Sequence, residues 1–237
     1  PDINYINGKY VLYYAMSVWG GEQTCGIGVA TANSPQGPFT DHGKMFRSNE
    51  IGVQNSIDPS LLQYEGRNYL VWGSFRGIYV IELTTDGLSI MPGAKKKRIA
   101  GTAFEAVYIH KHDDYYYMFA SIGSCCQGVK STYKVVVGRS KKVWGPYKDK
   151  TGKPMLKNGY SLVIGANDHF VGNGHGSQII QDDAGQDWLL YHGFSRSTPE
   201  NGRILLLDQI KWNQEGWPYV EGGSPSYETQ KAPVFNN

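Results

Sequence analysis

Several things are scarce in this sequence of 237 residues. It has three cysteines, Cys25, Cys125 and Cys126, which are too few for a disulfide scaffold and whose spacing fits no zinc site. The adjacent pair leaves two states open, a vicinal disulfide or two free thiols. No apolar run approaches the ~20 residues that a membrane helix needs. A formal net charge of +2 is also too small to favour nucleic acid or an anionic membrane as a partner.

A sustained helical period is missing as well, because no segment repeats apolar residues every 3.6 positions. What is abundant is glycine, with 30 residues, and tyrosine, with 17. Glycine favours turns and aromatic residues favour strands, so the composition predicts many short strands and little helix. A chain of this length can fold as one all-β unit. We therefore expect residues 1–237 to form a single domain.

One short pattern occurs four times. Each copy opens with an aromatic residue, passes through two mostly apolar positions to another aromatic residue, and ends in small or polar residues. The copies are Tyr10–Ala15, Tyr69–Ser74, Tyr116–Ser121 and Trp188–Gly193. A unit of three to four antiparallel strands repeated every ~40 to 70 residues is typical of a β-propeller, whereas a β-sandwich would not need its strands to repeat. The sequence predicts an all-β propeller with four countable blades.

An ionisable residue precedes each copy at an equivalent position. Counting back from the shared aromatic residue gives Asp2, Asp58, Glu105 and His175. The first strand of a propeller blade is innermost, so we expect these side chains to project toward the central cavity. Any one of them is readily explained as a local cap. Four together would cost stability unless function requires them, which favours a functional site.

Convergent carboxylates in an aromatic-lined cleft suit glycoside hydrolysis, in which one carboxyl protonates the leaving oxygen and another activates water or attacks the sugar. The aromatic residues expected near the cavity are Trp19, Trp72, Phe75, Tyr108 and Tyr191. Each of them would either stack on a sugar ring or belong to the core of a blade.

The other histidines are weaker candidates. His192, at the end of an expected inner strand, would line the cavity. The remaining four lie in expected turns or strand edges without metal-ligand spacing, and we interpret them as structural or solvated: His42, His110, His112 and His169.

Several motifs resemble glycoside hydrolase family 43, and within it the arabinanases. They run nearly end to end and include Pro1–Ile3, Asn55–Ser60 with Val71–Ser74 and Gly77–Tyr79, Ser121–Cys126 with Ser131–Ser140 and Gly145–Tyr147, and Gly172–His175 with Gly185–His192. The resemblance implies a five-bladed propeller that cleaves α-1,5-linked L-arabinofuranosyl bonds of plant cell-wall arabinan and arabino-oligosaccharides with inversion of the anomeric centre. It also implies a secreted or periplasmic bacterial enzyme.

The resemblance further implies roles for individual residues. Glu105 would be the general acid, and Asp58 the carboxylate that raises the pKa of the acid and orients it. His175 would lie beside a bound cation, usually calcium; one histidine is a poor calcium site by protein ligands, so another hard cation stays open. Substrate contacts would fall to Asn55, Trp72, Ser74, Phe75, Cys125 and Cys126.

The resemblance has one gap. The catalytic base of the family is an aspartate on the first blade, and Pro1–Ile3 resembles the second-blade motif. We therefore expect the base and the first blade outside this segment, in a longer polypeptide or in another chain that supplies the missing blade. A four-bladed variant with Asp2 as the base is the remaining alternative.

Other functions and the mode of action also stay open. An α-L-arabinofuranosidase or β-xylosidase of the same family is one alternative, and a non-catalytic propeller that binds carbohydrate is another. Retention of both Asp58 and Glu105 argues against a pure binder, which has no need of a protonated acid. Endo and exo action are not distinguished by the sequence.

Overall fold

The computed structural model describes residues 1–236. Strands dominate this part of the chain, and its single α-helix, α1 (Ser48–Ile51), is four residues long. No helix among the described residues is long and apolar enough to cross a membrane. The strands form four antiparallel sheets in which neighbours in sequence are mostly neighbours in the sheet. The predictions of low helix content and of four repeated strand units are confirmed for these residues.

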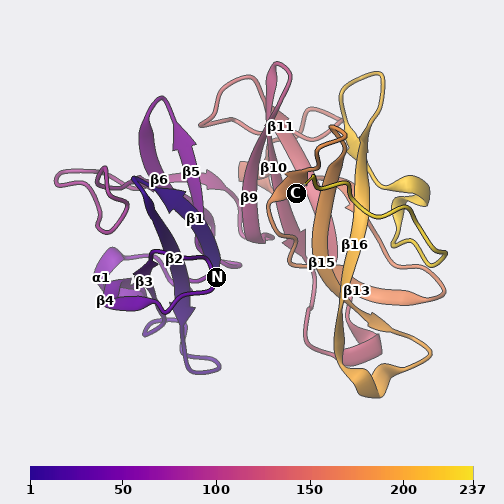
Figure 1. Cartoon of the computed structure of the whole chain (residues 1–237), viewed down its shortest axis with the longest axis horizontal. Helices are drawn as coiled ribbons and strands as arrows, with labels where there is room; N and C mark the ends of the chain where they lie inside the picture. The colour runs from indigo at the N-terminus through magenta and orange to yellow at the C-terminus, as the bar shows by residue number, and fades with distance from the viewer. Residues whose placement is uncertain (237) are drawn as a thin grey trace. The chain divides into compact units, whose positions relative to one another are not determined.

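The chain divides into two compact units, and the first comprises residues 1–107 and 155–158. It holds two four-stranded sheets, drawn in indigo to purple in Figure 1. The strands are β1 (Asp2–Ile6), β2 (Lys9–Met16), β3 (Gly26–Ala32) and β4 (Thr40–Arg47), then β5 (Ser60–Tyr64), β6 (Arg67–Trp72), β7 (Ile78–Glu82) and β8 (Lys97–Ala100). One hydrophobic cluster draws on both sheets and includes the buried rings of Tyr13, Phe46 and Trp72. This shared core holds the two sheets together.

The second unit comprises residues 108–154 and 159–237. Its sheets are β9 (Glu105–His112), β10 (Tyr115–Ile122), β11 (Lys134–Ser140) and β12 (Ser161–Ile164), then β13 (Phe170–Gly174), β14 (Ile179–Gln181), β15 (Asp187–Ser195), β16 (Arg203–Trp212) and β17 (Pro218–Tyr219). The first three residues of β9 belong to the first unit. A second hydrophobic cluster, which includes Phe119, Leu189 and Trp217, packs these two sheets.

The four copies of the sequence pattern occupy the same place in each sheet. They lie in β2, β6, β10 and β15, except that Gly73 and Ser74 of the second copy follow the end of β6. These four strands are next to the first strand of their sheets. Apolar and aromatic residues in these strands lie against a neighbouring strand on each side, which explains why the pattern is rich in β-formers. The strand that follows each copy, β3, β7, β11 or β16, is also present as expected.

The structure partly corrects the placement of the four ionisable residues. Asp2 opens β1, Glu105 opens β9, and Asp58 comes two residues before β5. His175 does not open a strand. It lies between β13 and β14, which pair with opposite ends of β15 and so form one interrupted first strand. The irregular backbone at this break, with φ of +54° at His175, turns the residue out of the ladder.

Candidate active site

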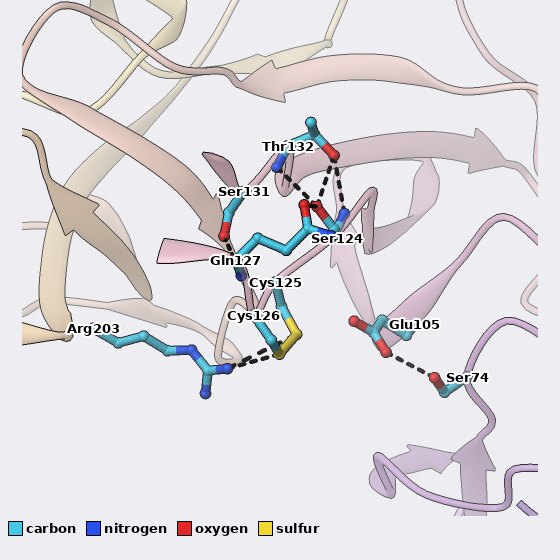
Figure 2. Close-up of a disulfide and its surroundings, with 9 residues drawn as sticks. All are labelled: Ser74, Glu105, Ser124, Cys125, Cys126, Gln127, Ser131, Thr132 and Arg203. Atoms are coloured by element: carbon cyan, nitrogen blue, oxygen red, sulfur yellow. Dashed lines mark hydrogen bonds between the residues drawn. A yellow bond between two sulfur atoms is a disulfide. The ribbon is translucent and has the colours of Figure 1, made fainter. Parts of the chain in front are cut away.

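The start of β9 holds Glu105 in a nearly enclosed position. Glu105 is 8% exposed, and the Oγ of Ser74 donates a hydrogen bond of 2.7 Å to its Oε2 (Figure 2). Ser74 itself is 1% exposed, so this bond is shielded from water. A shielded hydrogen bond of this kind fixes the rotamer of the carboxyl group, which an acid aimed at one substrate oxygen requires.

The loop that carries Ser74 is fixed in turn by Asn55. The Nδ2 of Asn55 donates to the carbonyl oxygen of Ser74 over 3.1 Å. Gly73 makes the turn possible, because its φ is +124° and an added Cβ would lie 2.3 Å from the carbonyl oxygen of Gly77. Asn55 and Ser74, which we expected to touch substrate, therefore support Glu105 in this structure.

Asp58 is tied to the backbone next to Glu105. Its Oδ2 accepts a hydrogen bond of 3.1 Å from the N–H of Ala106. Although Asp58 as a whole keeps some exposed surface, its carboxyl is buried, and this burial raises its pKa to about 6 against the opposing effect of the Ala106 donor. Both Asp58 and Ala106 have positive φ, at +55° and +50°. Strained backbone on both sides of the contact is typical of a functional site.

Two of the aromatic residues that we expected to stack on sugar are core residues. Trp72 is 0% exposed and donates through Nε1 to the Oγ of Ser56 over 3.1 Å. Tyr191 is 1% exposed, and its hydroxyl donates to the carboxylate of Asp208. The expectation that Trp72 contacts substrate is therefore wrong for this structure, because no face of its ring reaches solvent. Phe75 is half-buried and stays a candidate.

In the second unit, His175 and His192 lie close together. Their ring centroids are 6.2 Å apart, and the backbone N–H of His175 donates to the Oγ of Ser121 over 2.8 Å. Burial lowers the pKa of His192 to about 4, with further lowering by Arg203 and His175, so this imidazole is neutral at ordinary pH. Its Nδ1 is buried without a hydrogen-bond partner among the described residues.

Asn173 provides a second unpaired acceptor on the same strand as the His175 break. It is 0% exposed and donates through Nδ2 to the carbonyl oxygen of Gly165 over 2.8 Å. Its Oδ1 has no hydrogen-bond partner among residues 1–236. Buried polar atoms without partners are uncommon and often mark the place of an ordered water or an ion.

The adjacent cysteines are joined in a disulfide, which decides between the two states that the sequence left open. Cys125 is half-buried and Cys126 is exposed, on the loop between β10 and β11. Figure 2 shows the guanidinium of Arg203 against the pair, with Nη2 at 2.8 Å from the Sγ of Cys126. Hydrogen bonds between Ser124 and Thr132 close the base of this loop.

Comparison with known proteins identifies the family. The sequence model for glycosyl hydrolases family 43 matches residues 1–218. This chain belongs to glycosyl hydrolases family 43. The match covers sequence from both units, and it is consistent with the carboxylate pair at the start of β9.

Several characterised relatives of this family 43 chain are similar over most of its length. An extracellular endo-α-(1→5)-L-arabinanase of Bacillus subtilis is 38% identical over 92% of this chain and 67% of its own. An extracellular exo-α-(1→5)-L-arabinofuranosidase of Cellvibrio japonicus is 37% identical over 93% of this chain and 69% of its own. The solved structure of a Cellvibrio cellulosa α-L-arabinanase complexed with arabinohexaose matches 94% of this chain and 77% of its own, with a TM-score of 0.86 and 34% identity.

These likenesses confirm the predicted fold class for the family 43 chain. The four sheets are blades of a β-propeller, the architecture of the family 43 arabinanases. Asp2, at the repeat-equivalent position of the first sheet, accepts hydrogen bonds from the N–H of Leu61 and the Nδ2 of Asn4, both at 2.7 Å. Its carboxylate therefore connects β1 to β5, and this structural use favours a capping role.

The structure brings two histidines that we interpreted as lacking metal-ligand spacing close to an aspartate. His110 and His112 lie within β9, and with Asp187 they form a group whose potential ligand atoms all lie within 4.8 Å of one another. Burial lowers the pKa of His110 against the opposing charge of Asp187. Sequence reasoning missed this group because its third member comes from a distant strand. Of the described residues, only this group of three could hold a metal ion by side-chain ligands alone.

Proposed function

We propose that this family 43 protein hydrolyses α-1,5-linked L-arabinofuranosyl bonds in arabinan and arabino-oligosaccharides, with inversion at the anomeric carbon. The observation that carries the proposal is the carboxylate pair: Glu105 is enclosed and hydrogen-bonded by Ser74, and Asp58 is bonded to the adjoining backbone. The endo- and exo-acting arabinan enzymes among its relatives support the same substrate class. Because the family model spans sequence from both units, we treat residues 1–237 as one catalytic domain.

Glu105 would act as the general acid. It would protonate the glycosidic oxygen as the bond to the anomeric carbon breaks, which removes the need to expel an alkoxide. Asp58 would be the positioning residue. Its hydrogen bond from Ala106 fixes the backbone beside the acid, and its negative charge above about pH 6 favours retention of the proton on Glu105.

The general base would be a different carboxylate. An inverting glycosidase needs one to deprotonate the attacking water from the other face of the sugar ring. The family resemblance puts this aspartate on a blade to which none of the four sheets corresponds, and Asp2 is engaged in the bonds described above. We therefore propose that the base comes from a segment other than residues 1–237.

His175 would help to hold a hydrated hard cation such as calcium. The structure contributes a neutral second imidazole, His192, and an unpaired acceptor on Asn173, and these fit an ion whose shell is completed by waters and carbonyl oxygens. Such an ion would supply positive charge near the sugar. Phe75 and the Cys125–Cys126 disulfide would contact substrate, and the protein would be exported, as its extracellular relatives are.

Product analysis on linear α-1,5-arabinan tests the proposal. The polypeptide that contains these residues together with the base should release arabino-oligosaccharides, and proton NMR of the first product should show the inverted anomer. Replacing Glu105 with Gln should reduce release from arabinan strongly but spare more activity on an aryl arabinobioside with an acidic phenol, which needs little protonation. Equal loss on both substrates would refute the acid role, and no release from arabinan would refute the substrate assignment.

A further inference from the structure

We propose that His110, His112 and Asp187 form a binding site for a divalent transition-metal ion, with Zn²⁺ as the reference ion. This site shares no residue with the proposed active site or with the His175 region. It lies wholly within the second unit, and one possible ligand atom from each of the three residues lies within 4.8 Å of the other two.

Strand geometry explains how the two histidines come together. His110 and His112 are two positions apart in β9, so their side chains project from the same face of the strand. Their rings are stacked, with centroids 6.4 Å apart and planes 24° from parallel. Asp187 is the first residue of β15, which belongs to the other sheet of this unit. The group therefore spans the contact between two sheets.

Asp187 is the strongest reason to infer an ion. Its residue is 5% exposed, and its carboxylate accepts hydrogen bonds from the Nε1 of Trp212 at 2.7 Å and the Nε2 of Gln181 at 3.2 Å. Both donors are neutral. Among the described residues, the one ionisable cationic group recorded within 4 Å of it is His112, whose Nδ1 lies 3.9 Å from Oδ2. A buried carboxylate without a lysine or arginine partner is costly, and a bound cation would neutralise it.

The surroundings of His112 orient its ring for coordination. Trp212 stacks flat against it, with centroids 3.7 Å apart and planes 5° from parallel, and this leaves both ring nitrogens accessible in the ring plane. The Nε2 lies 3.5 Å from the carboxylate of Asp113. With its proton on Nε2, facing Asp113, the imidazole would present the lone pair of Nδ1 to an ion between it and Asp187. Metal-binding histidines typically have such a partner on the second nitrogen.

The donor set selects the class of ion. Two imidazoles and one carboxylate suit zinc and its neighbours in the first transition row, with a water at the open position. Calcium prefers six to eight oxygen ligands and is a poor match. Because the ligands come from β9 and β15, a bound ion would join two sheets of the second unit, so we expect it to stabilise the fold without taking part in hydrolysis.

Zinc titration of the untagged, chelator-stripped protein tests the site. Isothermal titration calorimetry should show one saturable Zn²⁺ site, and Zn²⁺ should raise the melting temperature by mass action. Replacing either His110 or His112 with Gln should weaken binding at least about tenfold and reduce the melting shift. These glutamine variants keep Asp187 with its two donors, and circular dichroism verifies that they fold.

Two histidine variants serve as matched controls. His169 is an exposed histidine of the same unit, stacked on Tyr227 at 3.6 Å, and His169→Gln should bind Zn²⁺ as the wild type does. His175→Gln should also keep this affinity, which separates the site from the proposed cation at His175. Absence of saturable binding, or binding that survives in both the His110 and the His112 variants, would overturn the proposal.

Discussion

Asp58 and Asp182 are aspartates near the first strands of their sheets, and their pKa values are shifted in opposite directions. Asp182 is 4% exposed but accepts four hydrogen bonds, from the N–H groups of Ala184, Gln186 and Val234 and from the Nε1 of Trp188. Burial alone would raise its pKa, yet the donors together lower it below the ordinary value. Among residues 1–236, Asp58 accepts one hydrogen bond, from the N–H of Ala106, and burial raises its pKa to about 6.

The difference shows that the supply of donors decides whether a buried carboxylate stabilises the fold. A fully bonded carboxylate behaves as a structural cap, whereas a carboxylate with few donors costs stability when it is ionised. Glu105 is nearly enclosed, and the Oγ of Ser74 donates a hydrogen bond to its carboxylate. Sites that are left short of donors are the ones that we expect to do chemistry.

The largest expected effect comes from removing the proton of Glu105. Glu105→Gln keeps the size of the side chain and can still accept the hydrogen bond of Ser74, so the fold should be preserved. Hydrolysis of arabinan should fall by about 10²- to 10⁴-fold, the usual contribution of a general acid. Steady-state kinetics on arabinan measure the loss, and a kcat within twofold of wild type would show that Glu105 is not the general acid.

Asp58→Asn should separate activity from stability. Activity should fall by roughly 10- to 100-fold, because the neutral amide keeps the Ala106 bond but supplies no negative charge beside the acid. At pH 7 the variant should be more stable by ~3 kcal/mol, since burial of the ionised carboxylate no longer costs free energy. Urea unfolding at pH 7 and at pH 4 measures the stability of the folded protein with Asp58 ionised and with Asp58 protonated.

The sign of the pH effect follows from the two pKa values. The unfolded chain ionises Asp58 near 3.8, and the folded protein keeps the proton until about 6. The free-energy cost of the ionised, buried Asp58 carboxylate is therefore absent below pH 4, grows as the pH rises to 6, and stays constant above it. The stability gained by Asp58→Asn should disappear at pH 4, and an equal gain at both pH values would contradict the raised pKa.

Ser74→Ala should have a smaller effect on activity, about tenfold on kcat with little change in KM. The substitution removes the hydrogen bond that Ser74 donates to Glu105 but leaves the carboxyl itself. Ser60→Ala is a matched control, because Ser60 is also buried and donates to a backbone carbonyl oxygen, that of Val107 at 2.7 Å. If both serine variants lose activity equally, Ser74 acts through general packing.

Asp182→Asn is expected to leave activity unchanged and to lower the melting temperature by several degrees. Asparagine has one acceptor oxygen where Asp182 uses two, so some of the four donors lose their partner. Differential scanning fluorimetry checks the shift, with Asp183→Asn on the neighbouring residue as a comparison. A higher melting temperature at pH 7, as predicted for Asp58→Asn, would break the distinction between the two aspartates.

The fold was predictable from sequence because its signal is local. The four aromatic patterns became β2, β6, β10 and β15, and each could be recognised within six residues. The same repeats placed Asp58 and Glu105 at equivalent points, and in the structure Asp58 accepts a hydrogen bond from Ala106, the residue next to Glu105 in β9. Repetition thus carries positional information that a single motif lacks.

The residues whose surroundings the sequence did not predict are those that depend on contacts between distant strands. Whether Trp72 and Tyr191 face substrate or core is decided by which sheet packs against them, and both proved to be buried. Asp187 lies close to His110 and His112 only because β15 packs near β9. The spacing of residues within either strand does not predict this packing. The break at His175 had a faint local signal in the flanking Gly172, Gly174 and Gly176, residues that weaken a strand.

That break between β13 and β14 has a consequence for protein engineering. β15 is paired with β16 at eight consecutive positions from Asp187 to Phe194, so its register is set on that side. The interrupted strand on the other side needs only short ladders at its two ends. Insertions after His175, within residues 176–178, are therefore expected to leave the register of the sheet unchanged. Because these residues adjoin the proposed cation residue His175, they are a suitable position for a combinatorial library aimed at new sugar specificities.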